Sequence, residues 1–153
     1  MPLIKKRFTS YKDFSEVRTI KELVGGKIKK IETKLIEELR SMVYLNKKKF
    51  KGFPLPTEAQ MSSIEDFYID KNEKQLLVYY VGNYKGFVTE LGVSTANPGG
   101  LLSAFNGESF LKNTPLPLPA FSEGRSIGPL QKNKLLILFN NEKALTLNLN
   151  TLK

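Results

Sequence analysis

Residues 135–150 read LLILFNNEKALTLNLN, and this stretch decides the fold class of the second part of the chain. Its first five residues are all apolar, which indicates a strand. Asn140 and Asn141 follow and favour a turn. Beyond the turn, leucine alternates with threonine or asparagine up to Asn150, so the leucines share one buried face of a strand. We therefore predict a pair of strands at this end of the sequence.

A second pair of strands is predicted upstream. Residues 67–69 (FYI) and 76–81 (LLVYYV) are rich in aromatic and branched side chains, and the polar residues 70–74 between them favour a turn. A third strand is expected at residues 87–93. Strand-like patterns of this kind recur after the prolines that follow the first third, so we expect residues 54–153 to be rich in strands.

One tract inside this strand-rich part has two interpretations. Residues 94–133 contain NPGG, PLPLP and SEGRSIGP, and a loop of that length is unusual in a small domain. The tract is either a long Gly/Pro loop that orders against a partner or a set of short irregular strands. Under the first interpretation it supplies a protein–protein interface.

The first third of the chain has helical spacing instead. Ser10 and Asp13 have the form of a capping box, and apolar residues recur behind them at intervals of three and four. This pattern predicts a helix over residues 11–24. Gly25 and Gly26 end that helix, because glycine enters the left-handed conformation without a side-chain clash.

A second amphipathic helix is predicted over residues 27–43. Its apolar stripe is formed by Ile28, Ile31, Leu35, Leu39 and Met42. Helices that are segregated from strands in the sequence are typical of an α+β fold. We therefore predict two N-terminal helices packed on a mainly antiparallel β-sheet.

Length and composition indicate one folded domain. The chain has 153 residues, of which 41% are hydrophobic and 25% are charged, so we expect a single domain over residues 1–153. No window is apolar enough to span a membrane, and the first residues lack the apolar segment of a secretory signal. We expect a cytoplasmic protein.

The net charge of +9 is concentrated at one end of the chain. Residues 1–53 contain fifteen Lys and Arg and six acidic residues, whereas residues 54–153 contain nine of each. A one-sided basic field attracts polyanions, so nucleic acid, an anionic membrane surface or an acidic protein surface is the expected partner. A lysine-rich, solvated helical face would produce the same composition.

The absence of cysteine and histidine excludes many kinds of chemistry. The chain has no thiolate nucleophile, no imidazole base and no sulfur or imidazole metal ligand. We expect no cofactor and no metal, and we assign no catalytic residue. Glu65, Asp66 and Asp70 cluster near a predicted strand, where carboxylates either bind magnesium or are ordinary surface residues beside a turn.

The strongest candidate for function is a basic set with aromatic residues among it. Lysines neutralise phosphates and exposed aromatic rings stack on unpaired bases, so this mixture suits RNA or single-stranded DNA. The predicted nucleic-acid-binding residues are Lys5, Lys6, Arg7, Lys47, Lys48, Lys49, Phe50 and Lys51.

The sequence therefore favours a non-enzymatic binding or assembly protein that works in a larger complex and contacts an anionic partner. Two alternatives stay open. One is an RNA-cleaving enzyme that dispenses with histidine, using lysine, arginine, tyrosine or glutamate to move protons. The other is a purely structural subunit held by protein–protein contacts.

Overall fold

The computed structural model describes residues 7–25, 34–71, 75–87, 90 and 92–152. The chain divides into two compact units, residues 1–38 and residues 39–153. Within the described ranges, no helix has the length and apolar character needed to cross a membrane.

The described part of the first unit contains the short helices α2 (Tyr11–Ser15) and α3 (Ile20–Val24). The prediction of one continuous helix over residues 11–24 was wrong, because Thr19 caps a new helix in the middle of that range. Neither helix has a buried residue. Helices this short receive little stability from their own hydrogen bonds.

Both helices begin at a hydroxyl cap. Ser10 Oγ accepts a hydrogen bond from the amide of Asp13 at 3.1 Å, and Thr19 Oγ1 accepts one from the amide of Glu22 at 3.2 Å. Gly25 ends α3 with φ at +62°. The predicted cap at Ser10 and the predicted helix end at Gly25 are therefore confirmed.

The second unit begins with a hairpin of two antiparallel strands, β1 (Met42–Lys47) and β2 (Lys49–Pro54). Lys47 pairs with Lys49, so Lys48 alone makes the turn, and its φ is +56°. This left-handed conformation is uncommon for a residue with a side chain. The hairpin is followed by the short 3₁₀ helix η2 (Thr57–Gln60).

The second predicted helix, residues 27–43, was wrong over its described part. Residues 34–41 are not helical, and the residues that follow form β1, while residues 26–33 lie outside the described part of the chain. Val43 and Tyr44 carry branched and aromatic side chains that favour a strand. Pairing with β2 gives that local preference a partner.

A four-stranded antiparallel sheet follows in the order β3-β4-β5-β6, so each strand lies beside its neighbour in sequence. The predicted hairpin of residues 67–81 is confirmed as the pair β3–β4. The strands are β3 (Ile64–Lys71), β4 (Leu76–Gly82), β5 (Gly99–Phe105) and β6 (Phe110–Pro115).

A three-stranded antiparallel sheet completes the second unit in the order β7-β8-β9. It contains β7 (Gly124–Gln131), β8 (Lys134–Phe139) and β9 (Leu145–Asn148), and the short 3₁₀ helix η4 (Leu149–Leu152) follows. The pair β8–β9 confirms the strand pair that was predicted near the end of the sequence.

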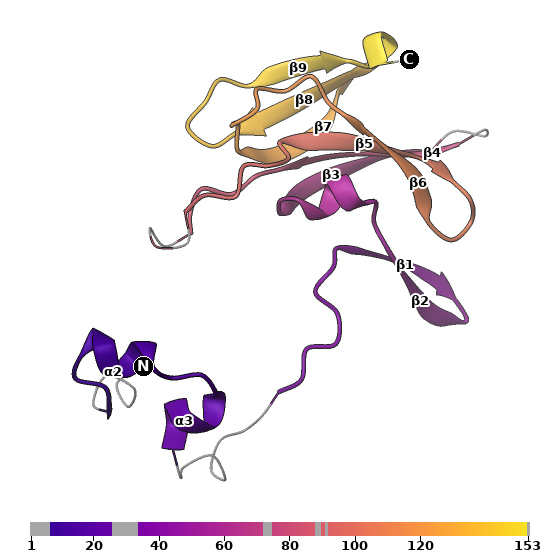
Figure 1. Ribbon diagram of the computed structural model, residues 1–153. Coiled ribbons are helices and arrows are strands. Elements are labelled where there is room, and N and C mark those ends of the chain that lie inside the picture. Colours follow the sequence, from indigo (N-terminus) through magenta and orange to yellow (C-terminus); the bar gives the residue numbers. More distant parts are fainter. Residues whose placement is uncertain (1–6, 26–33, 72–74, 88–89, 91, 153) are drawn as a thin grey trace. The chain divides into compact units, whose positions relative to one another are not determined.

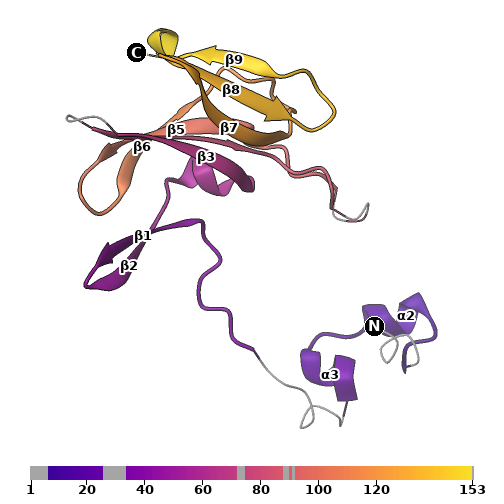
Figure 2. The same cartoon turned by 180° about the vertical axis from the view of Figure 1, so that it is seen from behind.

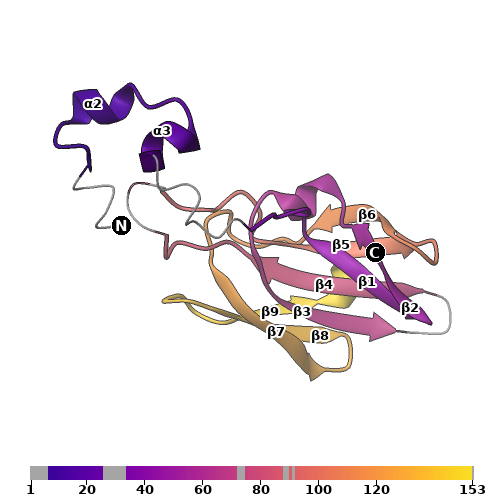
Figure 3. The same cartoon turned by 90° about the horizontal axis from the view of Figure 1, so that it is seen from below.

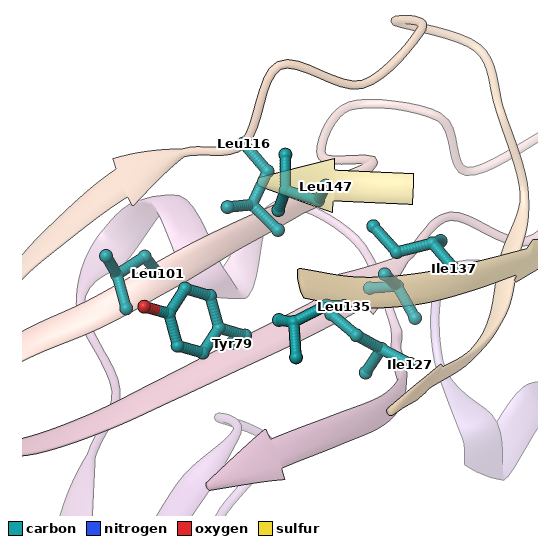
Figure 4. Close-up of a cluster of buried hydrophobic side chains, with 8 residues drawn as sticks. Tyr79, Leu101, Leu116, Ile127, Leu135, Ile137 and Leu147 are labelled. Atoms are coloured by element: carbon teal, nitrogen blue, oxygen red, sulfur yellow. The ribbon is translucent and has the colours of Figure 1, made fainter. Parts of the chain in front are cut away.

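The two sheets of the second unit pack face to face, as Figure 1 and, from behind, Figure 2 show. Figure 4 shows the buried side chains that meet between them. Burying this apolar surface is the main source of stability for such a sandwich. The core residues are Tyr79, Val81, Leu101 and Leu116 from the first sheet side, and Ile127, Leu135, Ile137 and Leu147 from the second.

The other face of the four-stranded sheet carries a second, smaller cluster. Ala59 of η2 packs there against Tyr80, Leu102 and Phe110, and Val43 of the hairpin joins them. Figure 3 shows the hairpin β1–β2 in front of this sheet. The hairpin and η2 therefore cover part of the outer face.

The predicted α+β class is wrong, because the described chain is mainly β: its strands form antiparallel sheets of two, four and three strands, and the helices α2 and α3 have only five residues each. Residues 94–133 contain β5, β6 and β7, so the second interpretation of that tract is correct. The strand expected at residues 87–93 is not present among its described residues, where only the bridge between Tyr84 and Ser94 flanks the range.

Candidate functional site

The hairpin β1–β2 gathers most of the basic residues that the sequence singled out. Lys47, Lys48 and Lys49 form its tip, Phe50 and Lys51 follow on β2, and all five are exposed. A turn of one residue between two strands brings these cations together without any further element. The described residues contain no ion-pair partner for Lys48 or Lys49.

Two of these lysines fasten the hairpin to the turn between β5 and β6. Lys47 Nζ donates to the carbonyl oxygen of Gly107 at 3.1 Å, and Lys51 Nζ lies 3.1 Å from Glu108 Oε1. Asn106 Oδ1 accepts from the amides of residues 108 and 109 and so shapes that turn. Both contacts are exposed, so each adds about 0–1 kcal/mol.

The opposite side of the hairpin presents aromatic rings. Tyr44 pairs with Gly52 and Asn46 pairs with Phe50, which places these side chains on one face because cross-strand partners share a face. Tyr44 and Phe50 are 60% and 72% exposed. The tip thus combines cations with solvent-exposed rings on a rigid ribbon.

A basic cavity of about 350 Å³ lies on the lysine side of the hairpin. Its walls include Leu45, Lys47, Lys49, Lys51 and Glu108. The single carboxylate is paired with Lys51, so the cavity keeps a net positive charge. An anionic group is the ligand that this charge favours.

The other predicted binding residues do not belong to this hairpin. Arg7 lies in the first unit, where its guanidinium carbon is 5.5 Å from the ring centroid of Phe8, a cation–π contact. Lys5 and Lys6 lie outside the described residues.

A neighbouring apolar cavity of about 330 Å³ was not predicted from the sequence. Its walls come from the first strand of the hairpin and from the outer face of the four-stranded sheet. Phe67 and Ile69 lie at this face and keep 58% and 50% of their surface exposed. The sequence of β4 indicated this second apolar face, because Leu76, Val78 and Tyr80 are as apolar as the residues that alternate with them.

Of the three carboxylates singled out near the first predicted strand, Glu65 and Asp66 lie in the contact between β3 and β7, and Asp70 lies near the other end of β3. Glu65 and Arg125 are the extra residues of two β-bulges, and Arg125 Nη1 is 2.6 Å from Glu65 Oε2. Asp66 Oδ2 accepts from Ser126 Oγ and from the amide of Ile127, both at 2.9 Å. These residues, here named the seam, join the edges of the two sheets.

A third carboxylate, Glu123, is almost fully buried beside the seam. Its Oε1 accepts from Arg125 Nη2 at 2.6 Å and from the amide of Lys85 at 3.1 Å, and its Oε2 accepts from Asn140 Nδ2 at 3.1 Å. The cluster borders an open polar cavity of about 570 Å³, which Tyr84 also lines. In the part of the chain that is described, no group of carboxylates could hold a metal ion.

The pKa values of Glu123 and Asp66 are lowered. Burial alone would raise the pKa of Glu123, but hydrogen bonds from the Lys85 amide and Asn140, and the charge of Arg125, outweigh it. Burial likewise opposes ionisation of Asp66, and hydrogen bonds from Ile127 and Ser126 lower its pKa. Both groups are therefore ionised, fully engaged acceptors at neutral pH.

Comparison of the chain with protein-family models, with curated proteins and with solved structures finds no match. Inference about function therefore depends on the chemistry of the chain's own surface. Two features of that surface are built from the same hairpin: a basic tip with exposed rings, and an apolar cavity beside it.

Proposed function

We propose that this protein is a non-enzymatic binding or assembly protein that contacts an anionic partner, nucleic acid, through the hairpin β1–β2. One observation carries the proposal: Lys47, Lys48, Lys49 and Lys51 gather on one hairpin together with the exposed ring of Phe50. This arrangement joins the two kinds of contact that single-stranded nucleic acids offer, phosphate charge and unstacked base faces.

The hairpin would use its two faces for different contacts. Lysines at the tip pair with successive phosphates and release condensed counterions, which gives affinity without sequence preference. Phe50 and Tyr44 stack on bases that are not paired, so single strands are favoured over duplex DNA. A partner bound in this way is held by charge and by stacking, with no covalent step.

The state of the carboxylates Glu123 and Asp66 supports a binding role rather than acid–base catalysis. A general acid or base works best when its pKa lies near the working pH. Glu123 and Asp66 have lowered pKa values and accept hydrogen bonds from Arg125, Asn140, Ser126 and backbone amides. Their geometry suits a structural contact between sheets.

The experiment is binding of labelled oligouridylate RNA across a salt series. If four lysines contact phosphates, the slope of log K against log[salt] is roughly −3, because each contact with a single strand contributes about −0.7. The test variant changes Lys47, Lys48, Lys49 and Lys51 to Gln, and we expect weak binding with a flat slope. Phe50→Ala should weaken binding and leave the slope unchanged.

The matched control removes the same charge elsewhere in the second unit. It changes four exposed lysines of that unit to Gln, which are Lys112, Lys132, Lys134 and Lys143. We expect the slope of the wild type from this control. Equal loss in both variants would show a field effect without a site, and no RNA binding at physiological salt would overturn the proposal. Divalent-independent cleavage of the RNA would favour the enzymatic alternative.

A further inference from the structure

The outer face of the four-stranded sheet is apolar but only partly covered. Phe67 and Ile69 pair with Tyr80 and Val78, so all four side chains share the face opposite the sandwich core. The hairpin is fastened at the β5–β6 turn and leaves Phe67 and Ile69 about half exposed. A sheet face that ordinarily meets water carries polar residues, so this face is suited to a further apolar partner.

The space between the hairpin and this face is a cavity of ligand size. Its volume is about 330 Å³, and its walls include Val43, Leu55, Leu76, Leu102 and Phe105. Ligand pockets in proteins span about 300 to 1,000 Å³, so this cavity has room for one slender apolar chain rather than a bulky ring system. Each methylene buried there would contribute about 0.8 kcal/mol.

The charge beside the cavity specifies the other end of the ligand. Leu45 lines both the apolar cavity and the basic cavity, so the two are neighbours. The basic cavity contains Lys47, Lys49 and Lys51, and only Lys51 is ion-paired among the described residues. An anionic head group would lie in the basic cavity while its chain lies against the sheet.

We propose that the apolar cavity under the hairpin binds the acyl chain of a single-chain anionic amphiphile, with Lys49 and Lys47 holding its carboxylate or phosphate head group. A free fatty acid and a lysolipid with an anionic head share this chemistry. The acyl-chain part of this inference does not rest on nucleic-acid binding, because the walls of the apolar cavity include neither a lysine nor Phe50. The head-group part shares Lys47 and Lys49 with the proposed nucleic-acid contact.

The experiment is isothermal titration calorimetry of the full chain with three ten-carbon probes: decanoate, decan-1-ol and decyltrimethylammonium, each below its micellar concentration. We expect one saturable site that binds decanoate about fivefold more tightly than the alcohol, since an exposed ion pair is worth up to about fivefold, and the cation most weakly. Decyl phosphate and lysophosphatidic acid then distinguish a free anion from a lipid head group.

Two variants separate the head group from the chain. Lys49→Gln should bring decanoate to the affinity of the alcohol and leave the alcohol unchanged. Phe67→Gln, at an exposed position that tolerates a polar residue, should weaken all three probes, whereas Leu111→Gln on β6, which is also exposed and does not line the cavity, should weaken none. Val78→Phe fills the cavity and should abolish binding, and urea unfolding checks that it folds.

Equal binding of all three probes would overturn the head-group assignment, and unchanged decanoate binding by Phe67→Gln would overturn the site. If light scattering shows a dimer that Phe67→Gln dissociates, a second copy occupies the face instead. Phe67→Gln changes no lysine, so its RNA binding should equal that of the wild type. If the wild type binds decanoate but does not bind RNA, only the nucleic-acid proposal is overturned.

Discussion

Asp66 illustrates how a single side chain joins two sheets. Its Oδ2 accepts from Ser126 Oγ and from the amide of Ile127, so a carboxylate of β3 satisfies groups at the edge of β7. A backbone amide at a sheet edge that lacks a strand partner needs such an acceptor when water is excluded. Beside it, Glu65 and Arg125 close the same contact with an ion pair.

Asp66→Asn should therefore destabilise the protein in a pH-dependent way. The pKa of Asp66 is lowered in the folded state from an ordinary value of 3.8, so its contribution is present above that value and is lost as the pH falls through the folded-state pKa. We expect a loss of about 1–2 kcal/mol in unfolding free energy at pH 7 and a much smaller loss at a pH below the folded-state pKa. Urea unfolding at both pH values measures this difference.

Asp70→Asn is the matched control, because it removes one negative charge from the same strand. It should change stability little at either pH, as surface substitutions usually do. If Asp66→Asn and Asp70→Asn shift the unfolding free energy equally at pH 7, the seam contact at Asp66 contributes nothing beyond charge.

Residue-level features were predictable where the signal is local. The cap at Ser10 depends on a residue three positions away, and it is confirmed. Glu65 and Asp66 were identified together with Asp70 as a carboxylate cluster, but the partners of the first two, Arg125 and Ser126, are about sixty residues away in sequence. Only the pairing register and the two bulges bring these groups together, and no sequence pattern shows a bulge position.

At the scale of elements, the hairpin β1–β2 depends on its turn. Lys48 has φ at +56°, a conformation that costs an ordinary residue about 1–2 kcal/mol and glycine almost nothing. The left-handed conformation of Lys48 therefore destabilises the hairpin, and the positive charge of this side chain does not depend on that conformation.

Lys48→Gly should stabilise the hairpin by up to about 1 kcal/mol, because relief of the left-handed strain outweighs the added freedom of the unfolded chain. Lys49→Gly removes the same charge from an extended position and should destabilise the hairpin by about 0.5–1 kcal/mol. Hydrogen exchange of the β1 and β2 amides measures both. If amide exchange is not slower in Lys48→Gly than in the wild type, a strained left-handed turn at Lys48 is contradicted.

Strands and helices were predicted well where apolar and polar residues alternate strictly, and poorly where the hydrophobic pattern fits both a helix and a strand. The β8–β9 pair follows from Leu145 and Leu147 alternating with polar residues. The stripe through Leu35, Leu39 and Met42 fits a helix equally, but strand pairing between residues 42–47 and 49–54 decides the outcome, and that pairing is not a property of either segment alone. The basic residues of the tip were thus singled out by residue type, but they were expected at the end of a helical first third, whereas they form a hairpin.

At the scale of the whole molecule, the two hydrophobic clusters belong to the second unit. Their members lie between Val43 and Leu152, and the short helices α2 and α3 bury nothing. The prediction that residues 1–153 form one domain is therefore open to a direct test. A chain that begins at Leu39 keeps both clusters and all nine strands of the described chain.

We expect the chain of residues 39–153 to fold by itself, with a urea midpoint within about 0.3 M of the full-length value. The unfolding free energy of small proteins falls by about 1–3 kcal/mol per molar urea, so this difference in midpoint corresponds to a small difference in stability. Circular dichroism measures the midpoint. A shorter chain that is unfolded, or whose midpoint falls by more than 1 M, would show that residues 1–38 stabilise the sheets and that one cooperative domain is the correct description.

The order of strands in the sheets, in which every strand pairs with its neighbour in sequence, has a kinetic consequence. The pairings other than β4–β5, whose connection spans residues 83–98, close short loops, so their entropic cost is small and their formation is early. The seam between Glu65 and Arg125 instead joins residues sixty positions apart. Refolding followed by stopped flow should therefore show strand pairing before the two sheets dock. The seam would then form last, and its loss would be the first step in opening the sandwich.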